Sequence, residues 1–305
     1  MHWAKINEVT TSSGIKFAFG VYKLFGRLPV RLILYPTIFW YLVTHSIARA
    51  ASRDYLTHLY QHTKGISPQP SLINIFRHFF AFGECILDKL IIWSGNIQDI
   101  AYSLKSDDSF ASTVNSGRGA IIVVSHIGNL DLSRAIANDF PNLKLTVLVH
   151  TTHAVKFNEL LKEINPESAI NTLQVSEFDV EDAISFSEKI DNGEMIAIAG
   201  DRIPLSGHGT INVDFLGEQA PLPIGPYALA RILKCPLYSL TSVKVNGQYI
   251  IQIKEIASSD ALSTNRSHNA KIAAQAFANG LVDICVQAPF QWFNFYPFWE
   301  KNSGK

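Results

Sequence analysis

The 305-residue sequence has few cysteines and no net charge. Cys85, Cys235 and Cys285 lie far apart and form no CxxC pair, which argues against a disulfide framework or a zinc site and favours a reducing compartment. Lys and Arg balance Asp and Glu, 26 against 26, so the chain as a whole gives no reason to expect a nucleic-acid partner. The first fifteen residues carry charge and lack the apolar core of a cleavable signal peptide.

Several catalytic signatures are also missing. The sequence contains no P-loop, HExxH or GxSxG motif, and "GHG" at 207–209 does not complete a dinucleotide-binding GxGxxG. The stretch "VHTTH" (149–153) has the His-x-x-His spacing of half a zinc site, but no third ligand lies nearby in the sequence. We therefore expect no metal, and we interpret His150 as a contact to a substrate or as a structural residue.

The first part of the chain is basic and aromatic. Residues 1–60 carry seven Lys or Arg against two Asp or Glu, a net charge of +5, and the rest of the chain carries −5. Residues 15–43 hold eight aromatic side chains, but their apolar core, Leu32–Val43, has twelve residues and includes Pro36. A transmembrane helix needs roughly 20 apolar residues, whereas aromatic and basic side chains together suit the headgroup boundary. We expect a helix or helical hairpin lying in one leaflet; the alternatives are a span that starts near Phe17 and a helix packed on the body.

A domain boundary is expected in the proline-containing loop "HTKGISPQPS" (62–71). It divides an N-terminal membrane-associated helical region, 1–65, from an α/β domain, 66–305. Directly after the loop, apolar residues recur at helical spacing over 71–95, which predicts a core helix.

Beyond residue 115, β-branched runs alternate with helical patterns. We predict strands at 120–125, 144–150, 194–200, 236–245 and 249–256, with a hairpin at Asn246-Gly247, and helices at 131–138, 154–163, 180–191, 225–234 and 265–287. This order predicts an α/β fold with a mixed central sheet flanked by helices. Active sites of such sheets gather at the carboxyl ends of strands, so His126, His150 and Asp201 are expected on one rim.

The stretch "VVSHIGNLDLSR" (123–134) ends an apolar run at His126, and Asp131 follows five residues later. Gly128 lets the chain turn tightly, so the Asp131 carboxylate can fold back towards the imidazole. There it would fix the tautomer and support the imidazolium that forms on proton uptake. The arrangement lacks a serine, and a substrate hydroxyl would replace it. The alternative is that Asp131 caps a helix and His126 packs in the core.

Asp201 and Arg202 follow the third of these strands, "EMIAIAG". A guanidinium at the rim suits a phosphate group. Asp201 could orient Arg202 or hydrogen-bond a substrate, and a surface salt bridge is the alternative.

"HIGNLD" (126–131) resembles the His-x₄-Asp block of the lysophospholipid acyltransferase superfamily. Within it, the block is similar to the His-x-Gly-Asn-Trp-Glu of the lipid A biosynthesis (lauroyl/myristoyl) acyltransferase branch. Residues 201–238 resemble the second block of that branch: an Asp after a strand, then "FLG", then Pro-x-Gly-Pro and a Leu-Ala helix. The segment "QWFNFYPFW" (291–299) departs from the arginine-containing end of that branch and is similar to a predicted acyltransferase group found beside aryl-polyene-type genes. The resemblance covers roughly residues 70–295 and implies acyl transfer without fixing lipid A as the acceptor.

The resemblance implies a glycerol-3-phosphate acyltransferase-like fold with His126 and Asp131 as catalytic residues. His126 would deprotonate an acceptor hydroxyl or amine, which attacks the thioester of an acyl carrier protein or coenzyme A; the thioester is a co-substrate, and no cofactor is expected. From the expected geometry, we infer that backbone N–H groups near Gly128 and Asn129, at the start of the following helix, stabilise the oxyanion. Arg202 would bind a phosphate of the phosphopantetheine arm or of a lipid headgroup.

The expected setting is the cytoplasmic face of a bacterial inner membrane, with membrane lipid as a further partner and the acceptor a lipid-like or glycosyl group. Two other functions stay open. A catalytically silent lipid-binding or assembly subunit would have no physical need for both His126 and Asp131. An acyl-thioester hydrolase would pass the acyl group to water, and the missing nucleophile elbow argues against it.

Overall fold

The computed structural model describes residues 12–135, 140, 143–149, 171–174, 180–203, 209–263 and 266–299. Its α-helices are α1 (Ser12–Phe25), α2 (Arg27–Thr44), α3 (Ser46–His62), α4 (Leu72–Trp93), α5 (Asp108–Asn115), α8 (Val180–Asp191), α9 (Gly225–Ile232), α10 (Ser259–Ser263) and α11 (Arg266–Gln287), with short 3₁₀ helices η2 (Ile97–Asp99) and η3 (Leu130–Ala135). Its strands are β1 (Tyr102–Ser106), β2 (Ile121–Gly128), β3 (Lys144–Val149), β4 (Asn171–Gln174), β5 (Glu194–Ala199), β6 (Thr210–Phe215), β7 (Glu218–Pro223), β8 (Leu237–Val245) and β9 (Gln248–Ala257).

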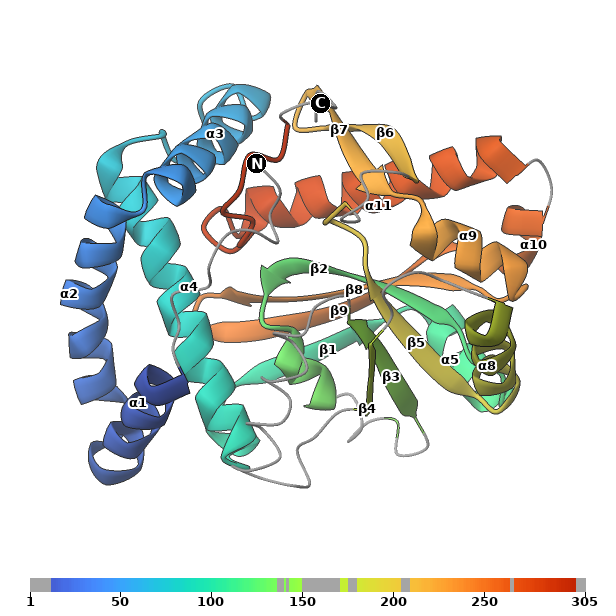
Figure 1. Cartoon of the computed structure of the whole chain (residues 1–305), viewed down its shortest axis with the longest axis horizontal. Coiled ribbons are helices and arrows are strands. Elements are labelled where there is room, and N and C mark those ends of the chain that lie inside the picture. The colour runs from blue at the N-terminus through green and yellow to red at the C-terminus, as the bar shows by residue number, and fades with distance from the viewer. Residues whose placement is uncertain are drawn as a thin grey trace.

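A seven-stranded sheet in the order β1-β9-β8-β2-β5-β3-β4 forms the centre of the molecule (Figure 1). The strands from β8 to β4 run parallel to one another, and β9 pairs antiparallel with β8 through a hairpin at Asn246-Gly247. Both turn residues have positive φ, 51° and 84°, as the two-residue hairpin turn that Asn-Gly favours requires. The predicted mixed α/β sheet is confirmed, and a separate hairpin of β6 and β7 adds a second small sheet.

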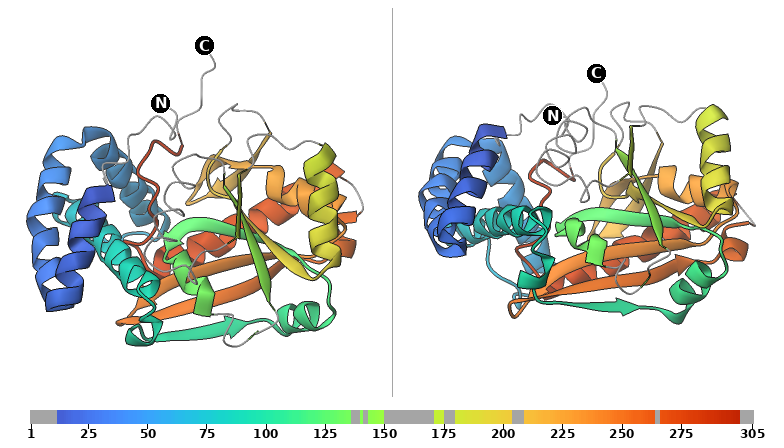
Figure 2. Two further views of the ribbon diagram at one scale, coloured as in Figure 1. Left: turned by 60° about the horizontal axis from the view of Figure 1, so that its bottom comes forward. Right: turned by 90° about the horizontal axis from the view of Figure 1, so that it is seen from below.

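The sheet is covered on both faces because its strands alternate their side chains between two cores. On β2, Ile121 and Val123 belong to one core and Ile122 and Val124 to the other. The first core contains apolar residues of α8, α9 and α11, and the second contains Phe110 of α5. Helix α11 lies along one face of the sheet, and α5 contributes to the core on the other face (Figures 1 and 2).

Helix α4 contributes to both cores and lies at the end of the sheet where β2 and β8 finish. Ser71 caps its N-terminus by accepting a hydrogen bond from the Asn74 N–H. Its first half contributes to the core under α11, and its second half to the core under α5. The Cys85 thiol donates to the Gly128 carbonyl, so α4 passes close to the end of β2.

Two helices, α1 and α2, occupy the N-terminal segment, and they meet at Gly26, whose φ is 76°. Salt bridges tie α2 to α4: Arg27 lies 2.7 Å from Asp88 and 3.2 Å from Glu84. Figure 2 shows α1 to α4 gathered at one end of the sheet. None of the helices in the described ranges has the length and apolar character needed to cross a bilayer.

Most predicted elements of the body are confirmed. Strands β2, β3, β5, β8 and β9 and helices α4, α8, α9 and α11 fall at the expected positions. The helix predicted at 131–138 is wrong over its described part, where the chain forms the 3₁₀ helix η3 instead. Strand β1 and the β6–β7 hairpin were not predicted. The helix expected at 154–163 lies outside the described residues, and the division of the chain near residue 65 stays a prediction.

Candidate active site

His126 lies near the carboxyl end of β2, where the strand changes partners. Up to Val124, β2 pairs with β5 and β8, and its register then shifts. Beyond Val124 the strand leaves β5 but still pairs with β8 at Gly128 and Ser242. It also contacts the segment after α11: Ile127 forms an antiparallel bridge with Trp292, and the Phe293 N–H donates to the His126 carbonyl. This separation from β5 leaves room for Asp201, which follows β5 on the same rim.

Asp201 is the partner of the His126 imidazole. Its Oδ1 lies 2.8 Å from His126 Nδ1, and its Oδ2 accepts the His126 backbone N–H at 2.8 Å. The same Oδ2 also accepts from Trp292 Nε1 at 3.1 Å and from Asn294 Nδ2 at 2.9 Å. The Asp201 side chain is fully buried, whereas the His126 side chain is 34% exposed. Three donors therefore hold one carboxylate oxygen, and the other oxygen faces the imidazole.

Close packing of the backbone makes this arrangement possible. Gly200, directly before Asp201, lies so near β2 that a Cβ atom there would come within 2.2 Å of Val123 Cγ1. Gly128 has φ 62°, and a Cβ atom there would meet the Ser242 carbonyl oxygen at 1.8 Å. A larger residue in place of Gly200 would push the end of β5 away from β2. A larger residue in place of Gly128 would push the end of β2 away from β8.

The electrostatics of the pair favour a neutral imidazole beside an ionised carboxylate. Burial and then the charge of Arg202 lower the pKa of His126, and Asp201 opposes this shift only in part. Burial acts to raise the pKa of Asp201, but His126 and Arg202 outweigh it, and the pKa is lowered. Because an ionised carboxylate only accepts hydrogen bonds, the proton of the neutral imidazole lies on Nδ1. Nε2 then carries a lone pair, and it makes no hydrogen bond to any residue that the structure describes.

Asp131 does not take the position expected for it. Its Oδ1 accepts from Trp93 Nε1 at 3.0 Å, and its Oδ2 lies 3.1 Å from Lys89 Nζ. The expectation that the Asp131 carboxylate holds the His126 imidazole by a ring nitrogen is therefore wrong in this geometry, because Asp201 holds the ring at Nδ1. The Lys89 charge nevertheless acts on the imidazole and lowers the pKa of His126, so the Asp131–Lys89 pair belongs to the surroundings of the site.

The expected oxyanion donors are also engaged elsewhere. The Gly128 N–H donates to the Gln291 carbonyl at 2.7 Å, and the Asn129 N–H donates to the Ser242 carbonyl at 2.7 Å. Both N–H groups hold the turn after β2 in place, so neither is available to an oxyanion in this structure, and the expected role of the neighbouring backbone N–H groups stays a prediction. Asn129 is itself fully buried.

Arg202 lies at the expected rim. Its Nε donates to Asn294 Oδ1 at 3.2 Å, so the amide of Asn294 bridges Arg202 and Asp201. The Tyr296 hydroxyl donates to the Asp201 carbonyl at 3.2 Å. Sequence reasoning missed the part that Trp292 and Asn294 play. Their two-residue spacing in an extended segment, which places both on one side, was the available signal.

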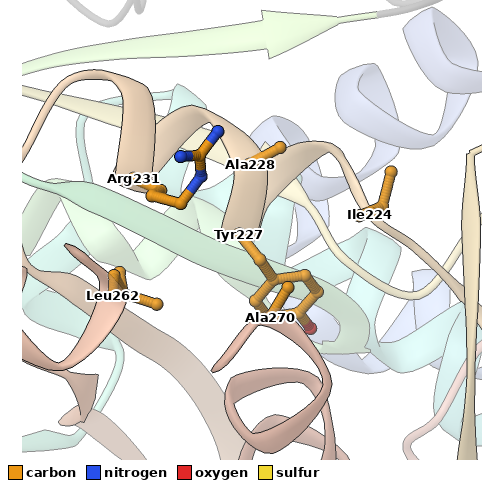
Figure 3. A pocket seen from close by; sticks show the side chains of 6 residues that line it. All are labelled: Ile224, Tyr227, Ala228, Arg231, Leu262 and Ala270. Atoms are coloured by element: carbon orange, nitrogen blue, oxygen red, sulfur yellow. The ribbon is translucent and has the colours of Figure 1, made fainter. Parts of the chain in front are cut away.

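The remaining expectations concern His150 and metal binding. His150 is outside the described residues. Among the residues that the structure does describe, no three His, Cys, Asp or Glu side chains form a group that could hold a metal. The cavity in Figure 3 has a volume of about 10 Å³, room for about one water molecule rather than an acyl chain. Its lining residues are Ile224, Tyr227, Ala228, Arg231, Leu262 and Ala270.

The fold and the site place a histidine, held by a buried carboxylate, at the carboxyl ends of the parallel strands of an α/β sheet. Residues 78–301 match the family described as bacterial lipid A biosynthesis acyltransferase. The matched range includes His126, Asp201 and Asn294. The chain belongs to this family and is an acyltransferase. No curated protein sequence matches the chain.

Proposed function

We propose that the protein transfers an acyl chain from a thioester, carried by an acyl carrier protein or by coenzyme A, to a hydroxyl or amine of a lipid-like or glycosyl acceptor. The observation that carries this proposal is the His126 imidazole, with Nδ1 bound to the buried Asp201 and Nε2 facing no described partner. Such a pair is a general base without a nucleophile of its own. Membership of an acyltransferase family supplies the reaction class.

The proposed reaction begins with proton transfer from the acceptor to Nε2 of His126. The acceptor oxygen or nitrogen then forms a bond to the thioester carbonyl carbon. When the tetrahedral intermediate collapses, the carbon–sulfur bond breaks, and the thiolate takes the proton back from the imidazolium. Asp201 remains ionised throughout and stabilises the imidazolium.

The oxyanion needs positive charge because the two backbone N–H groups after β2 are already used. We assign this role to Lys89 and Arg202, whose charges both act on the imidazole and lower its pKa. Asp131 holds the Lys89 ammonium at 3.1 Å, and Asn294 holds the Arg202 guanidinium at 3.2 Å. Asp131 thus contributes by positioning Lys89. Arg202 would also suit a phosphate of either substrate.

The acceptor is proposed to reach the site from a membrane, on the cytoplasmic face of a bacterial inner membrane. Support comes from α1 and α2, which expose many large apolar side chains beside basic ones. Trp40 is 69% exposed and Phe39 is 60% exposed. The other exposed apolar residues of this pair are Phe17, Leu24, Phe25, Leu28, Leu32, Ile33, Tyr35 and Val43.

The catalytic proposal is tested with purified protein, labelled acyl carrier protein or acyl-CoA, and an extract of bacterial membrane lipids, with products identified by mass. The wild type should acylate a lipid, and His126→Ala should lose most of this activity, by about 10²–10⁴-fold. Equal product from both proteins would rule out His126 as the base. Label released only as free acid would instead favour a hydrolase. No product from any donor would favour a silent lipid-binding subunit.

The membrane proposal is tested by flotation with vesicles that contain anionic lipid. Replacing Phe39 and Trp40 by glutamate should release the protein from the vesicles, because the apolar face then carries negative charge. Ile184→Glu is the matched control, since Ile184 on α8 is 57% exposed and lies on the α/β body. Equal flotation of the double variant and the control would overturn the membrane assignment of this face.

A further inference from the structure

A chain of buried hydrogen bonds leads from helix α3 to the candidate base. Ser52 Oγ on α3 lies 2.9 Å from Nδ1 of His78 on α4, and Nε2 of His78 lies 2.9 Å from the Trp292 carbonyl oxygen. The indole of the same Trp292 donates to Asp201, which binds His126. Ser52 and His78 are fully buried, and Trp292 is 1% exposed. His78 takes no direct part in the proposed proton transfer.

The direction of each bond in this chain is fixed by chemistry. A carbonyl oxygen only accepts, so the proton of His78 must lie on Nε2 to donate to Trp292. Nδ1 then accepts from the Ser52 hydroxyl. Burial lowers the pKa of His78 to about 4, so the ring is neutral at ordinary pH and holds this tautomer.

Trp292 connects His78 to the site through both its main chain and its side chain. Its carbonyl is held by His78, its backbone pairs with Ile127, and its indole Nε1 is one of the three donors on Asp201 Oδ2. The ring of Tyr55 on α3 packs edge-on against the indole, with centroids 5.1 Å apart. A shift of the Trp292 carbonyl would therefore move the indole relative to the carboxylate.

We propose that His78 is a positioning residue for the acyl transfer assigned to His126. By fixing Trp292, it orients the Asp201 carboxylate and joins the α3–α4 helices to the base. This inference rests on the proposed function. The competing explanation is that His78 only stabilises the fold.

Two substitutions separate these explanations. The longer side chain of His78→Gln places its amide near the position of Nε2 and can still donate to the Trp292 carbonyl. The shorter side chain of His78→Asn places its amide near Nδ1, beside Ser52, and leaves that carbonyl without its donor. We expect kcat of His78→Asn to fall by about tenfold or more, because small displacements of a catalytic group are costly, and we expect His78→Gln to restore much of the loss. Thermal unfolding of each variant gives the folded fraction for which kcat is corrected.

Two further measurements report on the site itself. The indole N–H resonance of Trp292, assigned with Trp292→Phe, should move in His78→Asn and stay near its wild-type position in His78→Gln. The acidic limb of the kcat/KM profile, which reports on His126, should move in His78→Asn. Tyr238→Phe is the control for loss of a remote, partly buried hydrogen bond, the one between Tyr238 and Thr113 on α5, and it should leave kcat and the profile unchanged.

The outcomes distinguish the two proposals. If His126→Ala is as active as the wild type, the proposed function fails. If His126→Ala is inactive while the two His78 variants have equal corrected kcat values and an unmoved acidic limb, the proposed function stands and the positioning role of His78 is overturned.

Discussion

Two carboxylates at the same edge of the sheet have very different surroundings. Asp201 has no exposed surface, and its Oδ2 accepts three hydrogen bonds from uncharged donors. Asp131 is 13% exposed, and its main charged partner is Lys89, which is 24% exposed. The Asp201 carboxylate is held by buried hydrogen-bond donors. The Asp131 carboxylate lies at the margin of the site and contacts the Trp93 indole and the Lys89 ammonium.

The comparison shows that nearness in sequence is a poor guide to which carboxylate serves a histidine. Asp131 follows His126 by only five residues, yet the turn after β2 directs it towards α4. Asp201 is 75 residues away, and the parallel pairing of β2 with β5 brings it to the imidazole. We therefore propose that Asp201 orients the base and that Asp131 positions Lys89; two experiments test this division, and a third tests the charge of Arg202 beside the imidazole.

The largest effect is expected from Asp201→Asn. The three donors at Oδ2 would bind the amide oxygen, so the amide NH₂ would face Nδ1 of His126. Nδ1 would then have to accept, the proton would move to Nε2, and the lone pair needed for catalysis would be lost. Activity should fall by about 10²–10⁴-fold, as measured by kcat with saturating thioester. Activity within about tenfold of wild type would contradict the assignment.

A smaller effect is expected from Asp131→Asn. The amide can still accept from the Trp93 indole, so the change mainly removes the ion pair with Lys89. A pair at such a site contributes up to about 1 kcal/mol, which corresponds to less than a tenfold change in rate. Steady-state kinetics of the two asparagine variants, measured side by side, give the comparison. If Asp131→Asn is as inactive as Asp201→Asn, the roles of the two carboxylates have been assigned wrongly.

The smallest effect is a shift in pH dependence when the charge of Arg202 is removed. A base works only when neutral, so activity is lost as the pH falls through the pKa of His126, which burial and Arg202 hold below its usual range. Without the positive charge the imidazole accepts a proton more readily, and the acidic limb of kcat/KM should move upward by up to about one pH unit in Arg202→Met. Arg202→Lys keeps the positive charge, so it should shift the acidic limb of the kcat/KM profile less than Arg202→Met does. Equal shifts in both variants would attribute the effect to the lost hydrogen bond with Asn294.

Much of the fold could be predicted because its signals are local. Runs such as "AIIVVS" and the Asn246-Gly247 turn determine strands and a hairpin without reference to the rest of the chain. The helix expected after Asp131 did not form over residues 131–135, because Asn129 and Asp131 satisfy local hydrogen bonds in a tighter 3₁₀ turn. Strand β1 was missed because its sequence, "YSLKS", is short and polar, and it is stabilised by pairing with the distant β9.

In the candidate site, too, some features follow from local sequence signals and others depend on long-range contacts. His126 and Asp201 could each be placed at the rim, since each follows a strand, but their contact depends on which strands are neighbours. The roles of Trp292 and Asn294 depend on the return of the segment after α11 to the end of β2. That return is a long-range property, and no pattern near His126 encodes it.

The lock on Nδ1 has a consequence for the order of events in a catalytic cycle. Because the bond between Nδ1 and Asp201 holds the ring in one orientation, only Nε2 can exchange a proton with a substrate. The proton taken up at Nε2 must therefore leave from Nε2. In the proposed reaction, the acceptor and the departing sulfur must then come within reach of the same nitrogen in one turnover. In the proposed transfer the acceptor attacks the thioester directly, so both substrates must be present together, and the kinetics should follow a ternary-complex pattern.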